Sequence, residues 1–203
     1  MKKNFRIAVI TPYYDEHPSI LAKCICSVAE QTKNCDHFMI ADGLPQSWIN
    51  DVENIRHIVL DKPHGNNGNT PRGLGSFIAK CEGYDAITYL DADNWYEKNH
   101  IEQCLEVLKN NNEKIDCIIS KRIIRGFDGT IFEKHSPELG HVDTSEIFLL
   151  KAAFYLIPCW INMPNEFGPI CDRIFSLIIF KMNLKIAYTE NPTINFLMRY
   201  EGP

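Results

Sequence analysis

The sequence has no apolar run long enough to cross a membrane. Its two most apolar windows, residues 147–161 and 174–180, are short, and Lys151 and Pro158 interrupt the first of them. A membrane-spanning helix needs about 20 consecutive, mostly apolar residues. The first residues also lack the apolar stretch of a signal peptide. We therefore expect a cytoplasmic protein without a transmembrane segment, and peripheral contact with a membrane stays open.

Zinc-ribbon and dithiol motifs are also missing, although the chain has eight cysteines. No two cysteines have the Cys-X-X-Cys spacing of such sites, and most lie in apolar stretches, as buried free thiols do. An excess of positive charge is absent too. The formal net charge is −5, which argues against a nucleic-acid partner. With 203 residues and no internal repeat, we expect one domain spanning residues 1–203.

Short apolar runs rich in β-branched residues alternate with segments of helical spacing through the first part of the chain. We expect strands at residues 6–11, 37–41, 55–60, 86–90 and 116–120, and helices at residues 18–31, 74–81 and 97–110. Residues 61–75 carry four glycines and two prolines and should form a long loop, a length that often signals function. This alternation predicts an α/β fold with a mainly parallel sheet flanked by helices.

Three polar clusters follow the first, second and fourth expected strands. They are residues 11–16, the pair Asp42-Gly43 and the triplet Asp91-Ala92-Asp93. Open α/β sheets bind ligands at the carboxyl ends of their strands, so the three clusters predict one nucleotide-sized crevice. Asp91 and Asp93 would point the same way from an extended chain, and neighbouring carboxylates favour a hard cation such as Mg²⁺ or Mn²⁺. A solvated turn is the plainer alternative.

The pattern changes after residue 121. Residues 121–125 and 130–133 look like two short strands around a turn, and the remainder mixes short apolar segments with proline and glycine. We expect residues 1–120 to bind the nucleotide-containing substrate. Residues 121–203 would then form a smaller mixed region that binds the second substrate.

Four ordered motifs in this chain resemble those of family 2 glycosyltransferases. They are Ile7-Ala8-Val9-Ile10-Thr11-Pro12-Tyr13-Tyr14, Asp42-Gly43, Asn69-Thr70-Pro71-Arg72-Gly73 and Leu90-Asp91-Ala92-Asp93-Asn94. The resemblance covers residues 5–110 well and residues 140–180 more loosely. It implies a GT-A fold, a UDP- or GDP-sugar donor, a divalent metal, and transfer to a hydroxyl of a glycan or other acceptor with inversion at the anomeric carbon.

The resemblance also assigns roles in the nucleoside pocket. Thr11, Pro12 and Tyr13 would border the nucleoside, and Asp42 would accept a hydrogen bond from its base. Arg72 would reach the base or the diphosphate, because a guanidinium fork fits phosphate well. From the residues alone, Asp42-Gly43 is also an ordinary turn, Arg72 is also a solvated residue near a helix start, and Tyr13 is also a packing group.

The metal ligands implied by the resemblance are Asp91, near the ribose, and Asp93, which would hold the ion that bridges the two phosphates. Mn²⁺ or Mg²⁺ would stabilise the departing diphosphate as a Lewis acid. His141 and Asp143 would share one face of a strand. They are candidates for the acceptor site, and His141 also for the metal shell.

The general base implied by the resemblance is Asp172, which precedes a helical run. The family often carries Glu-Asp at this point, whereas this chain has Cys171-Asp172. A helix-capping role is the structural alternative for Asp172, and Asp143 and Glu166 are competing bases. Trp160 is either a sugar-stacking platform or part of the core.

Two other functions remain open from the sequence. A nucleotidyltransferase should carry a glycine-rich, basic loop after its first strand, and residues 11–16 have neither glycine nor lysine. A catalytically inactive nucleotide-sugar-binding or scaffold protein would keep the donor half and lose the base. The histidines His17, His57 and His64 show no informative spacing, and we expect them at the surface.

Overall fold

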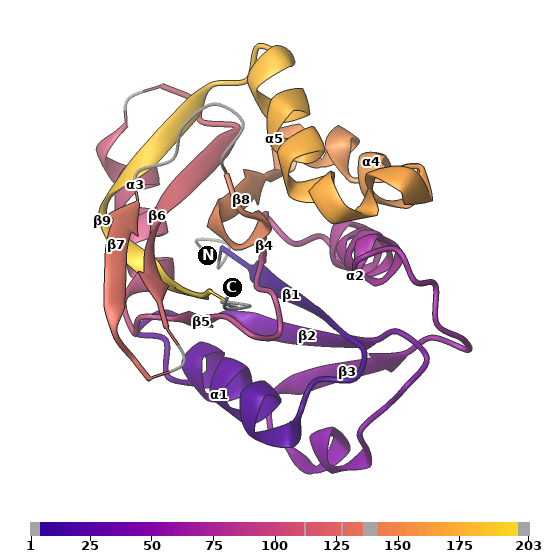
Figure 1. Cartoon of the computed structure of the whole chain (residues 1–203). Helices are drawn as coiled ribbons and strands as arrows, with labels where there is room; N and C mark the ends of the chain where they lie inside the picture. The colour runs from indigo at the N-terminus through magenta and orange to yellow at the C-terminus, as the bar shows by residue number, and fades with distance from the viewer. Residues whose placement is uncertain (1–4, 112, 127, 136–141, 199–203) are drawn as a thin grey trace.

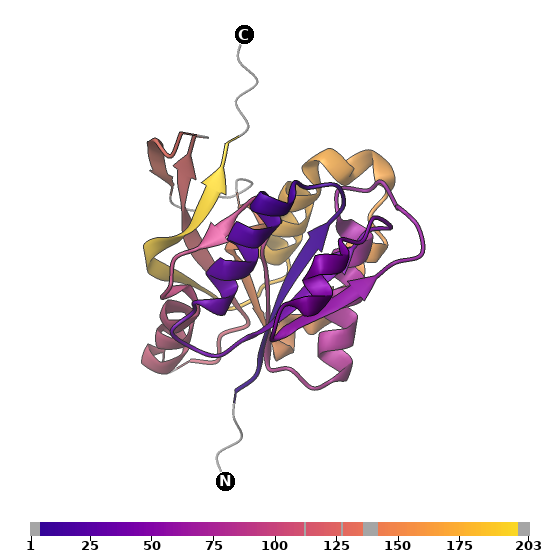
Figure 2. The same cartoon turned by 90° about the horizontal axis from the view of Figure 1, so that it is seen from below.

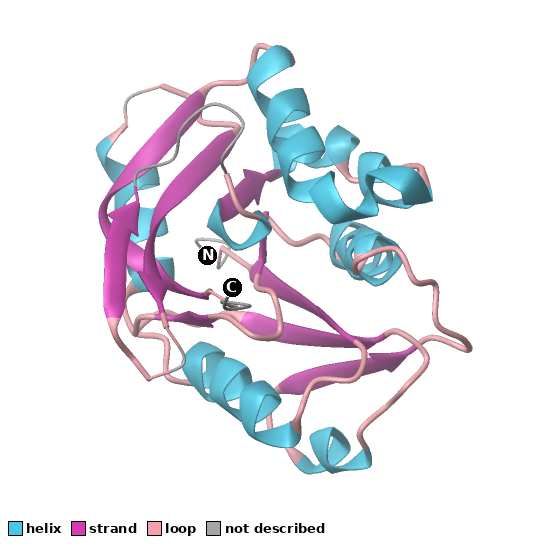
Figure 3. Ribbon diagram, in the orientation of Figure 1, coloured by secondary structure: helices cyan, strands magenta, loops and turns pink. Residues whose placement is uncertain are grey.

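The computed structural model describes residues 5–111, 113–126, 128–135 and 142–198. The strands are β1 (Ile7–Tyr13), β2 (Asp36–Ala41), β3 (Ile55–Val59), β4 (Ala86–Tyr89), β5 (Trp95–Tyr96), β6 (Cys117–Arg125), β7 (Ile131–His135), β8 (Ile147–Leu150) and β9 (Ile186–Leu197). The α-helices are α1 (Pro18–Ala29), α2 (Asn69–Cys81), α3 (His100–Asn110), α4 (Pro158–Ile161) and α5 (Cys171–Lys181). Four 3₁₀ helices are described as well: η1 (Ser47–Asp51), η2 (Thr144–Glu146), η3 (Lys151–Leu156) and η4 (Asn165–Ile170). Helices flank a curled sheet, so the predicted α/β fold is confirmed (Figure 3).

The sheet has the order β3-β2-β1-β4-β8-β6-β9-β5, with β7 paired to β6. Strands β3, β2, β1 and β4 run parallel, as expected for the first half. Strand β8 enters between β4 and β6 and is antiparallel to both, whereas β6 and β9 are parallel. Beyond β8, the strands β6, β7 and β9 curl away from the plane of β1–β3 (Figure 2).

Strand β1 shows why helices cover both faces of the sheet. Its side chains alternate between the two faces: Ile7 and Val9 pack with α1 and α3, and Ala8 and Ile10 pack with α2, α4 and α5. All four residues are buried. A strand buried on both faces reads as a continuous apolar run, as strands of parallel sheets do. Figure 1 shows α1 on one side of these strands and α2, α4 and α5 on the other.

Two predicted boundaries are corrected by the structure. Helix α2 begins at Asn69 rather than at residue 74, because Pro71 is tolerated in the first turn of a helix, where its missing N–H removes no helical bond. Residues 117–125 form the single strand β6, whereas the sequence predicts one strand at residues 116–120 and another at residues 121–125. Its pairing with β9 shifts register around Lys121, which disturbs the alternation without ending the strand. None of the helices that the structure describes is long and apolar enough to cross a membrane.

Trp160 belongs to the core and does not form a sugar platform. It has no exposed surface, its ring stacks on Phe175 with centroids 4.0 Å apart, and it meets the edge of Tyr89 at 5.6 Å. We expect Trp160→Ala to lower the free energy of unfolding by about 3–5 kcal/mol, the usual effect of emptying such a site. Denaturant unfolding measures this, with Tyr155→Ala at a half-exposed ring as the control. Unchanged stability in the Trp160 variant would contradict the assignment.

Candidate functional site

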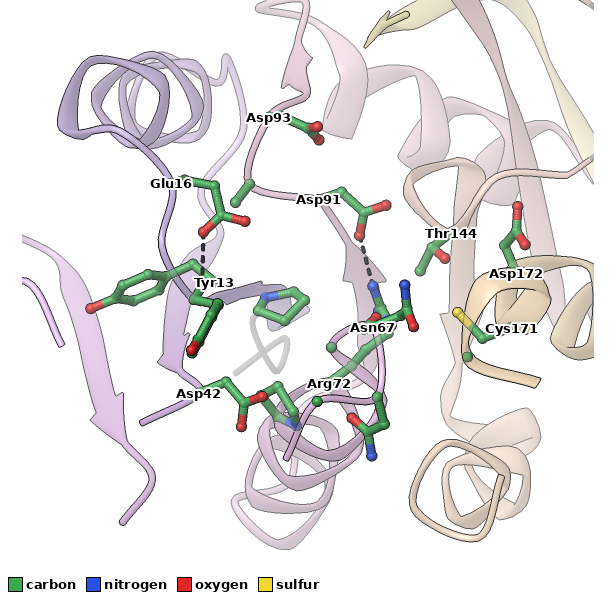
Figure 4. A pocket seen from close by; sticks show the side chains of 18 of the residues that line it. Tyr13, Glu16, Asp42, Asn67, Arg72, Asp91, Asp93, Thr144, Cys171 and Asp172 are labelled. Carbon is green, nitrogen blue, oxygen red and sulfur yellow. Dashed lines mark hydrogen bonds and ion pairs between the residues drawn. The ribbon is translucent and has the colours of Figure 1, made fainter. Parts of the chain in front are cut away.

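A cavity of about 520 Å³ lies at the carboxyl ends of β1, β2 and β4. Those strand ends contribute residues 12–14, Glu16, Asp42 and residues 91–93 to its wall. The loop before α2 and the segments around η2, η4 and the start of α5 complete it. Figure 4 shows Asp42 and Tyr13 on one side and Asp172 on the other, with Asp91 and Asp93 between them. The three polar clusters therefore share one cavity, as their positions after the strands predict.

Asp91 is held by a buried arginine. One nitrogen of the Arg72 guanidinium donates to Asp91 Oδ1 at 2.8 Å, and another donates to the Asn67 carbonyl and to Asn69 Oδ1, both at 3.3 Å. The Arg72 side chain is 3% exposed and its guanidinium lies over the Trp160 ring. Arg72 is thus not a solvated residue. Arg72 lines the cavity. Because two of its guanidinium nitrogens donate to other residues of the cavity wall, its first effect is to orient Asp91.

Asp42 faces the cavity with a partner that the sequence did not reveal. Its carboxylate accepts the backbone N–H of His64 at 3.2 and 3.1 Å and bonds to His64 Nδ1 at 2.6 Å. A Cβ on Gly43, where φ is +86°, would lie 2.3 Å from the backbone nitrogen of Pro63. Gly43 therefore lets the loop approach closely enough for His64 to reach Asp42. The expectation of a surface role for His64 is corrected, because it fixes a cavity carboxylate.

Tyr13 lines the cavity, and hydrogen bonds to its hydroxyl hold it in place. Its hydroxyl lies 2.7 Å from His57 Nε2 and accepts the backbone N–H of Gln46 at 3.0 Å. The His57 ring also stacks on Tyr13, with centroids 5.8 Å apart. His57 in turn bonds to Asn50 through Nδ1. His57 is therefore part of the support of the cavity wall and not a free surface residue.

Thr11 does not line the cavity, unlike Pro12 beside it. Strand β1 continues to Tyr13 rather than ending at residue 11, so Thr11 stays inside the sheet with no exposed surface. Its hydroxyl lies 2.8 Å from Nε2 of His37, whose pKa burial lowers to about 3. The expectation that Thr11 borders the nucleoside is corrected accordingly.

The carboxylates Asp91, Asp93 and Glu16 line the same part of the cavity. Among the described residues, no group of three His, Cys, Asp or Glu side chains is placed to hold a metal ion by itself. Mg²⁺ often takes only one or two carboxylates, with phosphates and waters as the other ligands. An oxygen-only pair such as Asp91 and Asp93 suits an ion of that kind, which would arrive with a diphosphate. His141 falls outside the described residues.

Asp172 lies in the first turn of α5, beside Cys171, and lines the cavity. The N-cap of α5 is Ile170 and not Asp172. Its Oδ1 accepts the backbone N–H of Arg173 at 2.7 Å, so the carboxylate satisfies one N–H of the first helical turn. Glu166, the alternative carboxylate of η4, is exposed and does not line the cavity.

Asp143 lines the cavity too, although not from a strand. Asp143 is the N-cap of η2. Its Oδ1 accepts the backbone N–H of Ser145, and Glu146 Oε2 accepts the backbone N–H of Asp143. Burial raises the pKa of Asp143 to about 7, and the nearby charge of Asp91 adds to this effect. Burial likewise raises the pKa of Glu146, against the opposing charge of Arg122. Asp143 therefore remains a second carboxyl group within the cavity wall.

Comparison with known sequences identifies the family of this chain. The sequence model of "Glycosyl transferase family 2" matches residues 8–180. The chain belongs to this family. No curated protein matches it by sequence.

The fold is similar to that of S. aureus TarS. The structure of TarS 1–349 with UDP-GlcNAc aligns with a TM-score of 0.74 and 16% identity, over 97% of this chain and 60% of that one. The same fragment with UDP gives a TM-score of 0.74 and 15% identity, over 95% and 60%. In a longer TarS structure the match covers only 37% of the TarS chain. This family 2 chain thus spans 60% of the shorter TarS fragment, and the likeness establishes the GT-A fold.

Proposed function

We propose that this family 2 chain transfers a sugar from a nucleoside diphosphate sugar to an acceptor hydroxyl, with inversion and with a divalent metal. One observation carries the proposal: Asp42, after β2, and Asp91 and Asp93, after β4, face a single cavity, and Asp172 faces it from the opposite wall. The first three suit a nucleotide and its metal, and the last suits a proton acceptor beside the sugar. The two halves of the chain would then hold the donor and the acceptor.

The proposed donor is a UDP-sugar. A carboxylate offers about four lone-pair positions, and His64 already donates to Asp42 through its backbone and through its ring. Capacity to accept an N–H of the base remains, and uracil presents one ring N–H. The UDP and UDP-GlcNAc complexes of TarS support the same choice.

The metal would be held by Asp91 and Asp93 together with the two phosphates. Bound there, Mn²⁺ or Mg²⁺ would neutralise charge on the leaving diphosphate. Arg72 keeps Asp91 in place through its 2.8 Å bond, and the buried guanidinium offsets part of the negative charge that gathers there. The short distance also means that Arg72→Lys, a shorter single-point donor, is not a conservative change.

The proposed base is Asp172. Its carboxylate takes the proton of the acceptor hydroxyl while that oxygen attacks the anomeric carbon. The new bond to the acceptor oxygen forms as the bond to the phosphate oxygen breaks, and the diphosphate leaves with the electron pair. Attack from the side opposite the leaving group inverts the anomeric configuration, which agrees with Asp172 facing the carboxylates across the cavity.

A nucleotide-sugar screen tests this function. The chain is incubated with UDP- and GDP-sugars, with and without Mn²⁺, and thermal shift and sugar release are both measured. A UDP-sugar should raise the melting temperature most, and only when Mn²⁺ is present. Stabilisation without transfer to any hydroxyl or to water would favour a binding or scaffold protein. No stabilisation by any nucleotide sugar would reject both functions.

Asp42 provides a prediction for the base pocket. Asp42→Ala should weaken UDP binding by about 1–3 kcal/mol, the usual range for losing a charged hydrogen-bond partner. Calorimetry with UDP measures this. Asp36→Ala is the matched control, because Asp36 begins the same strand at its opposite end and bonds to Tyr84 instead. Equal UDP affinity in the Asp42 variant and the parent would place the base elsewhere.

A further inference from the structure

The turn that carries the two proposed metal ligands is hydrogen-bonded to a serine from the other half of the chain. Ser145 Oγ accepts the backbone N–H of Asp91 at 3.2 Å and the side-chain amide of Asn94 at 3.1 Å. Asn94 also closes the turn, since its own N–H donates to the Asp91 carbonyl at 2.9 Å. Ser145 has no exposed surface and Asn94 is 1% exposed. One hydroxyl therefore ties both ends of the turn to η2.

The Asn94 side chain extends this connection to the last strand. Its Oδ1 accepts the backbone N–H of Leu197, at the end of β9, at 3.1 Å. The amide thus bridges η2 and β9, which lie 51 and 103 residues further along the chain. Both polar groups of this buried amide are satisfied, which removes the penalty of burying it.

Ser145 is held in turn by its own surroundings. Its N–H donates to Asp143 Oδ1 at 2.9 Å, and the Asp143 N–H donates to Glu146 Oε2 at 2.6 Å. Arg122 of β6 forms an ion pair with the same oxygen of Glu146. A capping box and a buried ion pair therefore fix the Ser145 hydroxyl before any ligand binds. Such pre-fixed supporting groups are what hold metal ligands in a productive orientation.

We propose that Ser145 and Asn94 are positioning residues that hold the Asp91–Asn94 turn so that both carboxylates present to one cation. They touch neither metal nor substrate and act only through the turn. This inference rests on the proposed function, because it takes Asp91 and Asp93 as ligands of a metal that carries the diphosphate. It adds that the second half of the chain sets the affinity of the donor site, in addition to holding the acceptor.

The test uses Ser145→Ala and Asn94→Ala in the full chain. UDP affinity is measured by calorimetry with Mn²⁺ and with EDTA, and Mn²⁺ alone by its electron paramagnetic resonance signal. We expect each variant to bind Mn²⁺, and UDP with Mn²⁺, about 10- to 100-fold more weakly, the usual effect of losing a supporting group. UDP affinity in EDTA should stay at the parent value. Ser120→Ala is the matched control, since Ser120 of β6 is equally buried but its hydroxyl pairs with Cys104 of α3.

A double variant adds a second criterion. Because Ser145 and Asn94 share one hydrogen bond, their combined effect on the Mn²⁺-dependent affinity should be smaller than the sum of the single effects. A purely structural role would lower the melting temperature but leave the ratio of the UDP affinity with Mn²⁺ to the UDP affinity with EDTA at the parent value. That result overturns the inference. If Asn94→Ala does not fold, Ser145→Ala decides alone. If the parent chain binds UDP equally well with and without Mn²⁺, the proposed metal site is wrong, and this inference is wrong with it.

Discussion

Asp172→Asn should reduce sugar transfer by at least about 10²-fold, the low end of what a general base contributes. Donor affinity should stay almost unchanged, because the proposed donor contacts lie on the strand ends and Asp172 lies on α5. The amide keeps the size of the carboxylate but carries no negative charge and cannot take the proton. A transfer assay and UDP calorimetry on the same preparation measure the two quantities.

Asp143→Asn and Glu166→Gln belong in the same assay. Asp143 lines the cavity and its pKa is raised to about 7, which is near the optimum for a base at neutral pH. Glu166 is exposed outside the cavity wall and serves as the control. Full transfer in the Asp172 variant would reject the inverting mechanism. A product that NMR shows to have retained the anomeric configuration would reject it as well. Loss of transfer in the Asp143 variant alone would move the base to η2.

Asp93→Asn should abolish the Mn²⁺ dependence of UDP binding while the fold survives. Asp93 is half-buried at the cavity wall, and an amide is a much poorer ligand for a hard cation than a carboxylate is. Calorimetry with Mn²⁺ and with EDTA should give the same UDP affinity in this variant, at the weak level that the parent shows in EDTA. Circular dichroism and the melting temperature report on the fold.

The control for this experiment is Asp51→Asn, at an exposed aspartate of η1. It should keep the full Mn²⁺ dependence of the parent. If the Asp93 variant keeps it as well, Asp93 is not a metal ligand and the turn has another role. If neither the variant nor the parent responds to Mn²⁺ or Mg²⁺, transfer in this chain proceeds without a divalent ion in the donor site.

The sequence by itself determined the arrangement of the first half of the chain. The alternation of β-rich runs with helical segments requires a layered α/β fold, because each run must bury its apolar side chains between helices. Parallel strands then bring their carboxyl ends to one edge of the sheet. That is why the positions of Asp42 and Asp91 after their strands are enough to assign both to one cavity, although they are far apart in the chain. The resemblance to family 2 glycosyltransferases added Asp172 as a candidate base, and the structure places it in the same cavity wall.

Only the tertiary structure decided how each polar side chain is used. Thr11 is one residue from the cavity-lining Pro12, yet it has no exposed surface and its hydroxyl contacts His37 of the neighbouring strand. Arg72 looks solvated in sequence, but α2 begins early and buries it against Asp91. The pairs His64–Asp42 and Ser145–Asn94 join residues 22 and 51 positions apart. A single sequence carries no periodic signal for such pairs, because their contact depends on how the loops and halves of the chain pack and not on local spacing.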